Sequence, residues 1–178
     1  MNVWKGLLFL GGYMSASMAL AEAQAERALA TPEPKQLVRQ FLEQVRAGRH
    51  PERAGEFLAE KVVAHQLVSE APADVARTPQ EYAAHIAQFQ ESYGRFDFEV
   101  TELIAEGDRV YARWRQVGCH VGAVDGHAPT RRPVVELASA VYRVQAGRIV
   151  EYWIQVDRLG TEAQLQANDQ AAQPAACA

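Results

Sequence analysis

The second half of this chain alternates apolar and polar residues over long stretches. Between residues 96 and 157 the hydrophobic pattern has a period of two, whereas apolar residues before residue 94 recur at helical spacing. A period of two is typical of β-strands with one buried face, because successive side chains point to opposite sides of a strand. The alternation predicts four antiparallel strands, at about residues 96–105, 109–121, 134–144 and 148–157.

Three helices are expected before these strands. The first covers residues 37–45, and a short second helix begins at Pro51. The third opens with a capping box between Thr78 and Glu81 and ends at Gly94. Helices first and an antiparallel sheet afterwards predict a domain of the α+β class.

Size and charge restrict the class of protein. The 178 residues, 48% of them hydrophobic, suffice for one sizeable core. The net charge is −4 and the 18 Lys and Arg residues are scattered, which argues against nucleic acid as the main partner. The absence of an uninterrupted apolar run of 18 or more residues excludes a multi-span membrane protein.

The N-terminus has the features of a secretory signal peptide. Lys5 precedes an apolar stretch at residues 6–20 and a small-residue cleavage pattern. The protein is therefore expected to be periplasmic or secreted; an uncleaved anchor or a disordered leader stays open, and a leader without function would leave the protein cytoplasmic. The expected order is a signal peptide at 1–21, a linker at 22–34, the domain at 35–168 and a disordered tail at 169–178.

The two cysteines lie far apart in the sequence. Cys119 falls in an expected strand and Cys177 in the Ala- and Gln-rich tail. This spacing does not indicate a disulfide framework, so both are expected to be unpaired, although export would permit a bond.

A series of short motifs follows in order along the second half of the chain: EGDRV at 106–110, GCHVG at 118–122, Gly126, PT at 129–130, GRIVE at 147–151, Trp153, Asp157 and QL at 164–165. This series resembles the SnoaL-like ester cyclases, a polyketide cyclase family of the nuclear transport factor 2-like (NTF2-like) superfamily. The likeness covers about residues 36–166. It implies a cone-shaped fold, in which a curved antiparallel sheet wraps around N-terminal helices and leaves an apolar pocket at its open end.

The resemblance also implies a reaction. Characterised members close a ring in a polyketide methyl ester by an intramolecular aldol condensation, with an Asp of the last strand as acid and base and no cofactor. Asp157 is the matching position, and one carboxylate can first remove and then return a proton. Desolvation against Trp153 would make Asp157 a stronger base. The alternative for Asp157 is a surface or helix-capping carboxylate.

Further candidate residues share a strand face with these positions. Trp153 and Gln155 lie on the Asp157 face of the last strand, and they are expected to contact the ligand. On the hairpin strand, Trp114 and His120 share a face with Ala112, Gln116 and Gly118, so Trp114 is expected to bind substrate and His120 to donate to an oxyanion.

Other histidines and Glu151 have weaker claims to a catalytic role. His65 resembles a histidine that often lines the pocket in relatives, and the alternative is a structural role. For Trp153 the alternative is ordinary packing in the core. Glu151 is expected to pair with an arginine. The histidines lack a compact ligand spacing, and so neither a metal nor a cofactor is expected. Cys119 and Arg131 depart from the family pattern, which often has a hydroxyl residue and a glycine there.

The sequence leaves three functions open. The first is acid–base cyclase or isomerase chemistry on a small apolar or aromatic carbonyl compound. The second is epoxide hydrolysis in the same fold, with Asp157, Glu151 and Arg143 or Arg113 positioning water. The third is an exported, non-catalytic binding protein for an apolar metabolite.

Self-association is expected from the opposite face of the last strand. Val150, Tyr152, Ile154 and Val156 share that face, which would leave an apolar surface exposed if it pointed outward. A homodimer formed through the sheet would cover it.

Overall fold

The computed structural model describes residues 33–171 and Cys177. The predicted signal peptide and nearly all of the predicted linker lie outside the described residues, as does most of the tail. Within the described part of the chain, no helix is both long enough and apolar enough to cross a membrane.

Helices and strands follow one another in an α+β order, which confirms the predicted class. The helical segments are α2 (Pro34–Phe41), the π-helix η1 (Leu42–Arg46), the 3₁₀ helix η2 (Pro51–Glu56), α3 (Pro79–Tyr93) and α4 (Arg158–Asp169). The strands are β1 (Leu58–Gln66), β2 (Ala73–Arg77), β3 (Asp97–Glu106), β4 (Arg109–Cys119), β5 (Pro133–Gln145) and β6 (Arg148–Val156).

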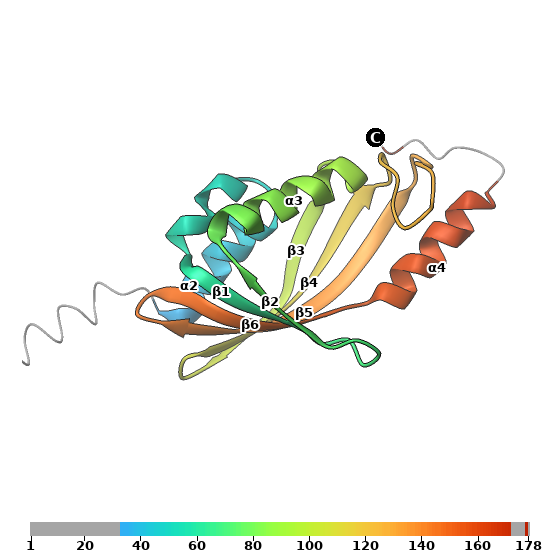
Figure 1. The fold of residues 1–178 in the computed structure, drawn as a ribbon. Coiled ribbons are helices and arrows are strands. Elements are labelled where there is room, and N and C mark those ends of the chain that lie inside the picture. The colour runs from blue at the N-terminus through green and yellow to red at the C-terminus, as the bar shows by residue number, and fades with distance from the viewer. Residues whose placement is uncertain (1–32, 172–176, 178) are drawn as a thin grey trace, which may run out of the picture. The chain divides into compact units, whose positions relative to one another are not determined.

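The six strands form one curved sheet in the order β2-β1-β6-β5-β4-β3. The four predicted strands, β3 to β6, pair antiparallel with their neighbours. Strand β1 joins β6 in parallel and pairs antiparallel with the edge strand β2. Figure 1 shows α2 and α3 on the same side of this sheet, with α4 continuing from the end of β6. The helices and the inner face of the sheet share one hydrophobic core.

The predicted inner face of β4 is confirmed. The alternate residues of this strand from Val110 onward are buried, and the series continues to His120 just beyond its end. Trp114, Gln116 and His120 are each at most 1% exposed. Two polar side chains and an indole are therefore enclosed in the interior of the domain.

The orientation predicted for β6 is wrong. Tyr152 is buried, and Ile154 and Val156 pack against the core, so the apolar face points inward. Trp153 and Gln155 point to the other side of the sheet. The alternation holds from Tyr152 to Val156, but a β-bulge at Val150 places Ile149, instead of Val150, in the core. Periodicity only says which residues share a face, and not which face meets the helices. The apolar surface on which the homodimer prediction rested is thus core, and the oligomeric state stays an untested prediction.

The first helix changes its winding before it ends. The amide of Ala47 donates to the carbonyl of Leu42 at 2.8 Å, a bond spanning five residues that defines a π-helical turn. Such turns are frequent at functional sites. This one ends at Arg46, whose side chain is buried under α3 and the sheet.

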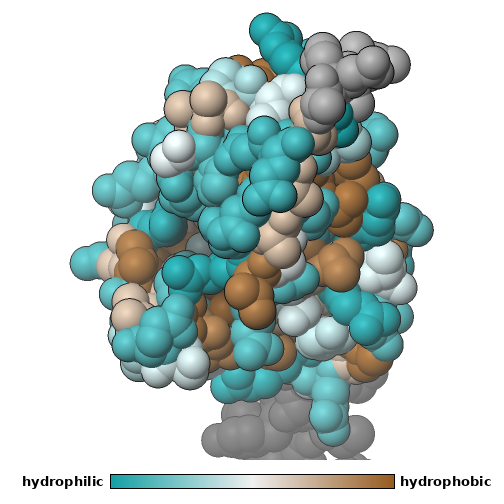
Figure 2. Space-filling view, turned by 90° about the vertical axis from the view of Figure 1, so that its right-hand side faces the viewer, coloured by the Kyte–Doolittle hydropathy of each residue, from teal (hydrophilic) through white to brown (hydrophobic). Residues whose placement is uncertain are grey.

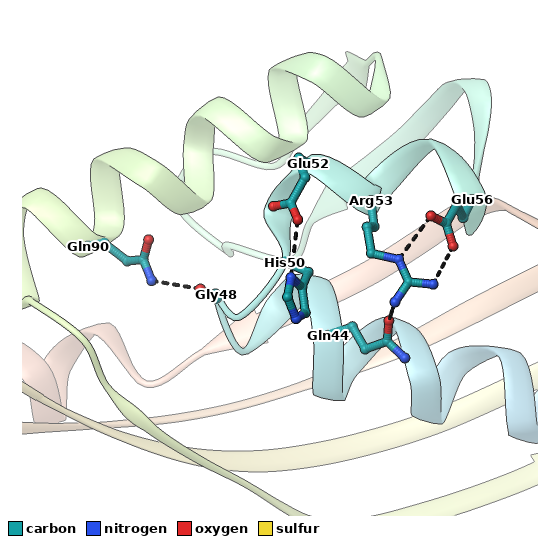
Figure 3. A network of polar contacts seen from close by, with 7 residues as sticks. All are labelled: Gln44, Gly48, His50, Glu52, Arg53, Glu56 and Gln90. Carbon is teal, nitrogen blue, oxygen red and sulfur yellow. Dashed lines mark hydrogen bonds and ion pairs between the residues drawn. The ribbon is translucent and has the colours of Figure 1, made fainter.

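Polar contacts fasten the chain that follows Arg46 (Figure 3). The Gln90 side chain of α3 donates to the carbonyl of Gly48 at 2.9 Å. In η2, Arg53 is bonded to Glu56 and reaches back to Gln44 of η1. The helix end that carries Arg46 is therefore held from two sides.

Two glycines let α3 approach β4 closely. A Cβ at Gly118 would lie 2.7 Å from the Tyr93 Cβ, and one at Gly122 would lie 2.5 Å from the Glu91 carbonyl oxygen. The amides of Val121 and Gly122 both donate to the carbonyl of Ser92 at 2.9 Å. The motif GCHVG therefore fixes the end of α3 and the position of Tyr93.

The expectation of unpaired cysteines is wrong. Cys119 and Cys177 form a disulfide across 58 residues, with their Cα atoms 5.8 Å apart. The Cys177 amide also donates to the carbonyl of Arg131, at 3.2 Å. Arg131 has a φ of +58°, a left-handed conformation that suits glycine better than arginine. Cys119 and Arg131, the two departures from the family pattern, therefore both bind Cys177 of the C-terminal tail.

Candidate functional site

A cavity of about 890 Å³ opens beside α4. Its walls come from α3, α4, the ends of β5 and β6, and the loops after β1 and β4. Phe89, Tyr93, Val156 and Leu165 supply apolar surface, and carboxylates interrupt it. Figure 2, which faces the end of the domain that carries α4, shows hydrophobic side chains gathered among hydrophilic ones.

Asp157 lies on the wall of this cavity, at the junction of β6 and α4. It is the N-cap residue of α4, and its Oδ1 accepts the Gly160 amide at 2.9 Å. Gly160 has no Cβ that would collide with this carboxylate. Asp157 is exposed and Trp153 lies on the other face of the sheet, so the predicted desolvation of Asp157 by Trp153 is not found. The capping role and a position on the cavity coexist.

A second carboxylate, Glu136, lies deeper on the inner face of β5. Its Oε1 accepts from the Arg46 Nη2 at 2.9 Å, and the two side chains are only 14% and 8% exposed. Burial raises the pKa of Glu136, and the positive charge of Arg46 opposes this shift. Neither residue was predicted. The available signal was an acid within the apolar stripe of β5 formed by Val134, Ala138 and Ala140.

Aromatic rings surround the Arg46 guanidinium. Its Cζ lies 5.3 Å from the ring centroid of Trp114, 5.6 Å from that of Phe89 and 5.9 Å from that of Phe98. Cation–π contacts of this kind favour arginine because its planar head is weakly hydrated. Arg46 is therefore a fixed, buried group that holds Glu136, one of the residues that line the cavity.

Several buried polar atoms of Arg46 and of the buried β4 stripe that ends at His120 find no hydrogen-bond partner among the described residues. They are the Arg46 Nη1, the Trp114 Nε1, the Gln116 Oε1 and Nε2, and the His120 Nε2. Trp114 is near enough to Glu136 to lower the pKa of that carboxyl, yet its N–H meets no acceptor with hydrogen-bond geometry. Gln116 lies directly opposite Glu136 across the β4–β5 ladder, and both border a small niche beside Phe89 and Tyr93.

His120 is buried at the end of β4. Its Nδ1 lies 3.2 Å from the Thr130 Oγ1, and its ring lies 6.2 Å from the ring of Tyr93, which lines the cavity. Burial lowers the pKa of His120 and so favours the neutral imidazole. The structure therefore places this predicted donor behind the cavity wall.

Three predicted site residues lie on the outer face of the sheet, away from the cavity. His65 stacks on Trp153, with ring centroids 4.8 Å apart, and the Arg109 Cζ lies 4.6 Å from the centroid of the Trp153 ring. Gln155 is exposed. The predicted contacts of Trp153, Gln155 and His65 with a ligand in the cavity are therefore not supported by their positions.

His65 belongs instead to a polar cluster on this outer face. Its Nδ1 lies 2.6 Å from Asp74 and its Nε2 lies 2.8 Å from Glu151, while the Arg143 Nε donates to Glu151 at 2.7 Å. The carboxylates of Glu151 and Asp74 raise the pKa of His65, and Arg143 followed by His65 lowers the pKa of Glu151. The predicted pairing of Glu151 with an arginine is confirmed. The constellation considered for epoxide hydrolysis is not assembled, because Glu151, Arg143 and Arg113 do not line the cavity that Asp157 borders. Arg113 is paired instead with Glu102.

The loop after β4 is attached to α4 through His127. Its ring nitrogens lie 2.5 Å from Asp169 and 3.3 Å from Glu162, and these carboxylates raise the pKa of His127. In the described part of the chain, no three His, Cys, Asp or Glu side chains are grouped as a metal site would require.

Comparison with known proteins agrees with this architecture. A model of the family described as SnoaL-like polyketide cyclase matches residues 36–165. No curated protein matches the chain. The structure resembles that of a proposed polyketide cyclase from Acidithiobacillus ferrooxidans, with a TM-score of 0.67, 21% identity and coverage of 76% of this chain and 96% of that one.

Two further solved structures have the same fold. IdmH, a proposed polyketide cyclase from Streptomyces antibioticus, gives a TM-score of 0.64 at 26% identity, covering 76% of this chain and 99% of its own. A SnoaL-like polyketide cyclase from Agrobacterium tumefaciens gives 0.61 at 16% identity, covering 75% and 98%. Because the family model spans most of the chain and the helices and curved sheet agree with it, this protein belongs to the SnoaL-like polyketide cyclase family and has the NTF2-like fold.

Proposed function

We propose that this protein catalyses cofactor-independent proton transfer on a small, largely apolar carbonyl compound, as in an aldol-type ring closure or a related isomerisation. One observation carries the proposal: two of the five acidic residues that line a single, partly apolar cavity, Asp157 and Glu136, have unlike surroundings, because Asp157 is exposed and Glu136 is buried against Arg46. Carboxyl groups that differ in environment are suited to opposite roles, one as a base and the other as an acid.

The chemistry assigns a step to each group. The exposed Asp157 removes a proton from the carbon next to the carbonyl, and the C–H electron pair forms the double bond of an enolate. The protonated Asp157 then returns this proton to the enolate or to the new alkoxide. Glu136, which is paired with Arg46 and whose pKa is raised by burial, is the second group on the cavity wall that is suited to take up a proton. The volume of about 890 Å³ falls in the range of small-molecule pockets.

The proposal is tested by following deuterium exchange into 2-tetralone, a bicyclic ketone with acidic α-protons, by NMR in heavy water. The wild-type protein should accelerate the exchange. Asp157→Asn and Glu136→Gln should each slow it by about a hundredfold or more, which is the usual contribution of a general acid or base. Asn can still cap α4, so the Asp157→Asn variant should keep its fold.

Asp108→Asn is the matched control, because this residue lies in the β3–β4 turn and does not line the cavity. Its exchange rate should equal that of the wild type. A non-catalytic binding protein is the alternative function, and it would bind the ketone without accelerating exchange. That result would contradict the enzymatic proposal.

Export stays part of the proposal. The Cys119–Cys177 disulfide supports it, because such bonds persist in oxidising compartments. Mass spectrometry of the protein recovered from the periplasm or medium of an expressing cell tests this; an intact N-terminus at residue 1 would contradict it.

A further inference from the structure

Most of the unpartnered polar atoms near Glu136 are hydrogen-bond donors. Of the four atoms that belong to Arg46, Trp114 and Gln116, three are donors, namely the Arg46 Nη1, the Trp114 Nε1 and the Gln116 Nε2; the Gln116 Oε1 is the acceptor. Buried donors are normally paired, because each unpaired one retains its full desolvation penalty. A group with this excess of donors is suited to receive an oxygen acceptor.

The charge balance of the cluster restricts that acceptor further. Arg46 is already paired with Glu136 at 2.9 Å, so the cluster has no uncompensated positive charge. Its other neighbours are the aromatic rings of Phe89 and Phe98. A full anion bound here would be buried without a counter-charge. A neutral carbonyl or enol oxygen needs no counter-charge, and so it is the better fit.

The backbone places these groups side by side. Trp114 and Gln116 are alternate residues on the inner face of β4, and Gln116 is the direct cross-strand neighbour of Glu136. Directly opposed residues bring their Cβ atoms within about 5 Å of each other. Glu136, Phe89, Tyr93 and Thr161 line both the 890 Å³ cavity and the small niche that Gln116 borders, so the niche adjoins the cavity. Trp114 and Arg46 line neither, and they contact the cluster from within the core.

We propose that Gln116, backed by Trp114 and the Arg46–Glu136 pair, forms a subsite that binds the neutral carbonyl or enol oxygen of the ligand. This inference rests on the proposed function in placing the ligand in the cavity, but it does not require that the protein catalyses a reaction. The subsite would serve an enzyme or a binding protein equally. It makes Gln116 a determinant of specificity for oxygen-bearing ligands over hydrocarbons.

The test compares two ligands of similar shape, 2-tetralone and tetralin, which differ by the carbonyl oxygen. Dissociation constants from NMR titration should favour 2-tetralone by about three- to tenfold, the effect of one neutral hydrogen bond. Gln116→Met keeps the length of the side chain and removes its polar atoms. It should abolish most of this preference while leaving tetralin binding unchanged.

Gln155→Met is the matched control, because Gln155 is exposed on the outer face of the same sheet. It should leave both dissociation constants unchanged. Thermal unfolding gives a second readout: removing an unpaired buried amide should keep the Tm of Gln116→Met at or above that of the wild type. A Tm several degrees lower would show that Gln116 is structural and would overturn the subsite, as would an unaltered preference for 2-tetralone.

Failure of the subsite and failure of the proposed function give different results. If the wild type prefers 2-tetralone but does not accelerate deuterium exchange, the subsite stands and the catalytic proposal falls. If exchange is accelerated but Gln116→Met keeps the preference, the subsite alone falls. Binding of neither compound by the wild type would overturn both.

Discussion

The two faces of the sheet differ in whether their polar side chains have hydrogen-bond partners. On the outer face, His65, Glu151 and Arg143 are bonded to one another, and Trp153 is covered by His65 and Arg109. On the inner face, polar atoms of Trp114, Gln116, Arg46 and His120 find no partner within the described residues. Saturated networks stabilise a fold, whereas unsaturated buried groups reduce stability and persist where function requires them. The inner face is therefore the one arranged for a ligand.

The largest expected effect concerns the buried ion pair of the inner face. Arg46→Met leaves the Glu136 carboxylate buried without its counter-charge, and should lower the free energy of unfolding by about 3–5 kcal/mol. Removing Arg46 removes the charge that opposes the raised pKa of Glu136, so the deficit should shrink as the pH falls through the folded-state pKa. Urea unfolding at several pH values measures both.

The outer face supplies the control for that substitution. Arg143→Met removes an arginine from Glu151, but this pair is more exposed and Glu151 keeps His65 as a partner. Its loss should lower the free energy of unfolding by about 1 kcal/mol or less. Equal losses for Arg46→Met and Arg143→Met would contradict the contrast between the faces.

A smaller effect is expected at the end of β4, where Cys119 is bonded to the C-terminal tail. The Cys119–Cys177 bond closes a loop with a sequence separation of 58 residues, so Cys177→Ser should reduce the free energy of unfolding by about 2–4 kcal/mol. Urea unfolding of the variant, and of the wild type with and without a reductant, measures this loss. The reductant should not affect the variant; a reductant-sensitive variant would argue against this bond as the source.

The smallest effect concerns the pH dependence of the outer cluster. The pKa of His65 is raised by Glu151 and Asp74, so the protonated form is favoured by folding. This stabilisation should be fully present below a pH of about 6.5, the ordinary value, and should be lost as the pH rises through the higher folded-state value. His65→Gln should remove about 1 kcal/mol of stability at pH 5.5 and much less at pH 9, as measured by urea unfolding.

His50→Gln controls for the general effect of losing a histidine. His50 is more than half exposed and lies 3.1 Å from Glu52. This variant should show little difference from the wild type at either pH. A pH-independent loss in His65→Gln would mean that His65 contributes through stacking on Trp153 instead of through its charge.

The alternation of hydrophobic residues determined much of the fold in advance. The β4 stripe that ends at His120 is buried as predicted, and Thr78 caps α3 together with Glu81 as the capping box indicated. Strands β1 and β2 were not predicted as part of the sheet, because β1 joins it through β6, which lies far away in the sequence, and β2 is attached only to β1. Pairing between distant strands leaves little local signal.

The site was less predictable for a physical reason. Asp157 was found through its position in the family pattern, and it does line the cavity. Glu136 and Arg46 were missed because each is unremarkable alone, and their significance comes from a contact across 90 residues. The role predicted for Trp153 was wrong because its ring lies on the outer face of the sheet, where His65 and Arg109 from other strands pack against it. Side-chain type does not reveal such a partner.

The π-helical turn between Leu42 and Arg46 has a consequence for sequence change in this family. Successive residues of a helix are separated by about 100° around its axis, so deleting one residue from this turn would rotate Arg46 away from Glu136 without altering either residue. The pairing of Glu136 with Arg46 thus depends on the number of residues in the π-helical turn as much as on their identities. A relative could gain or lose this ion pair through a single-codon insertion or deletion, which a comparison of residue identities alone would overlook.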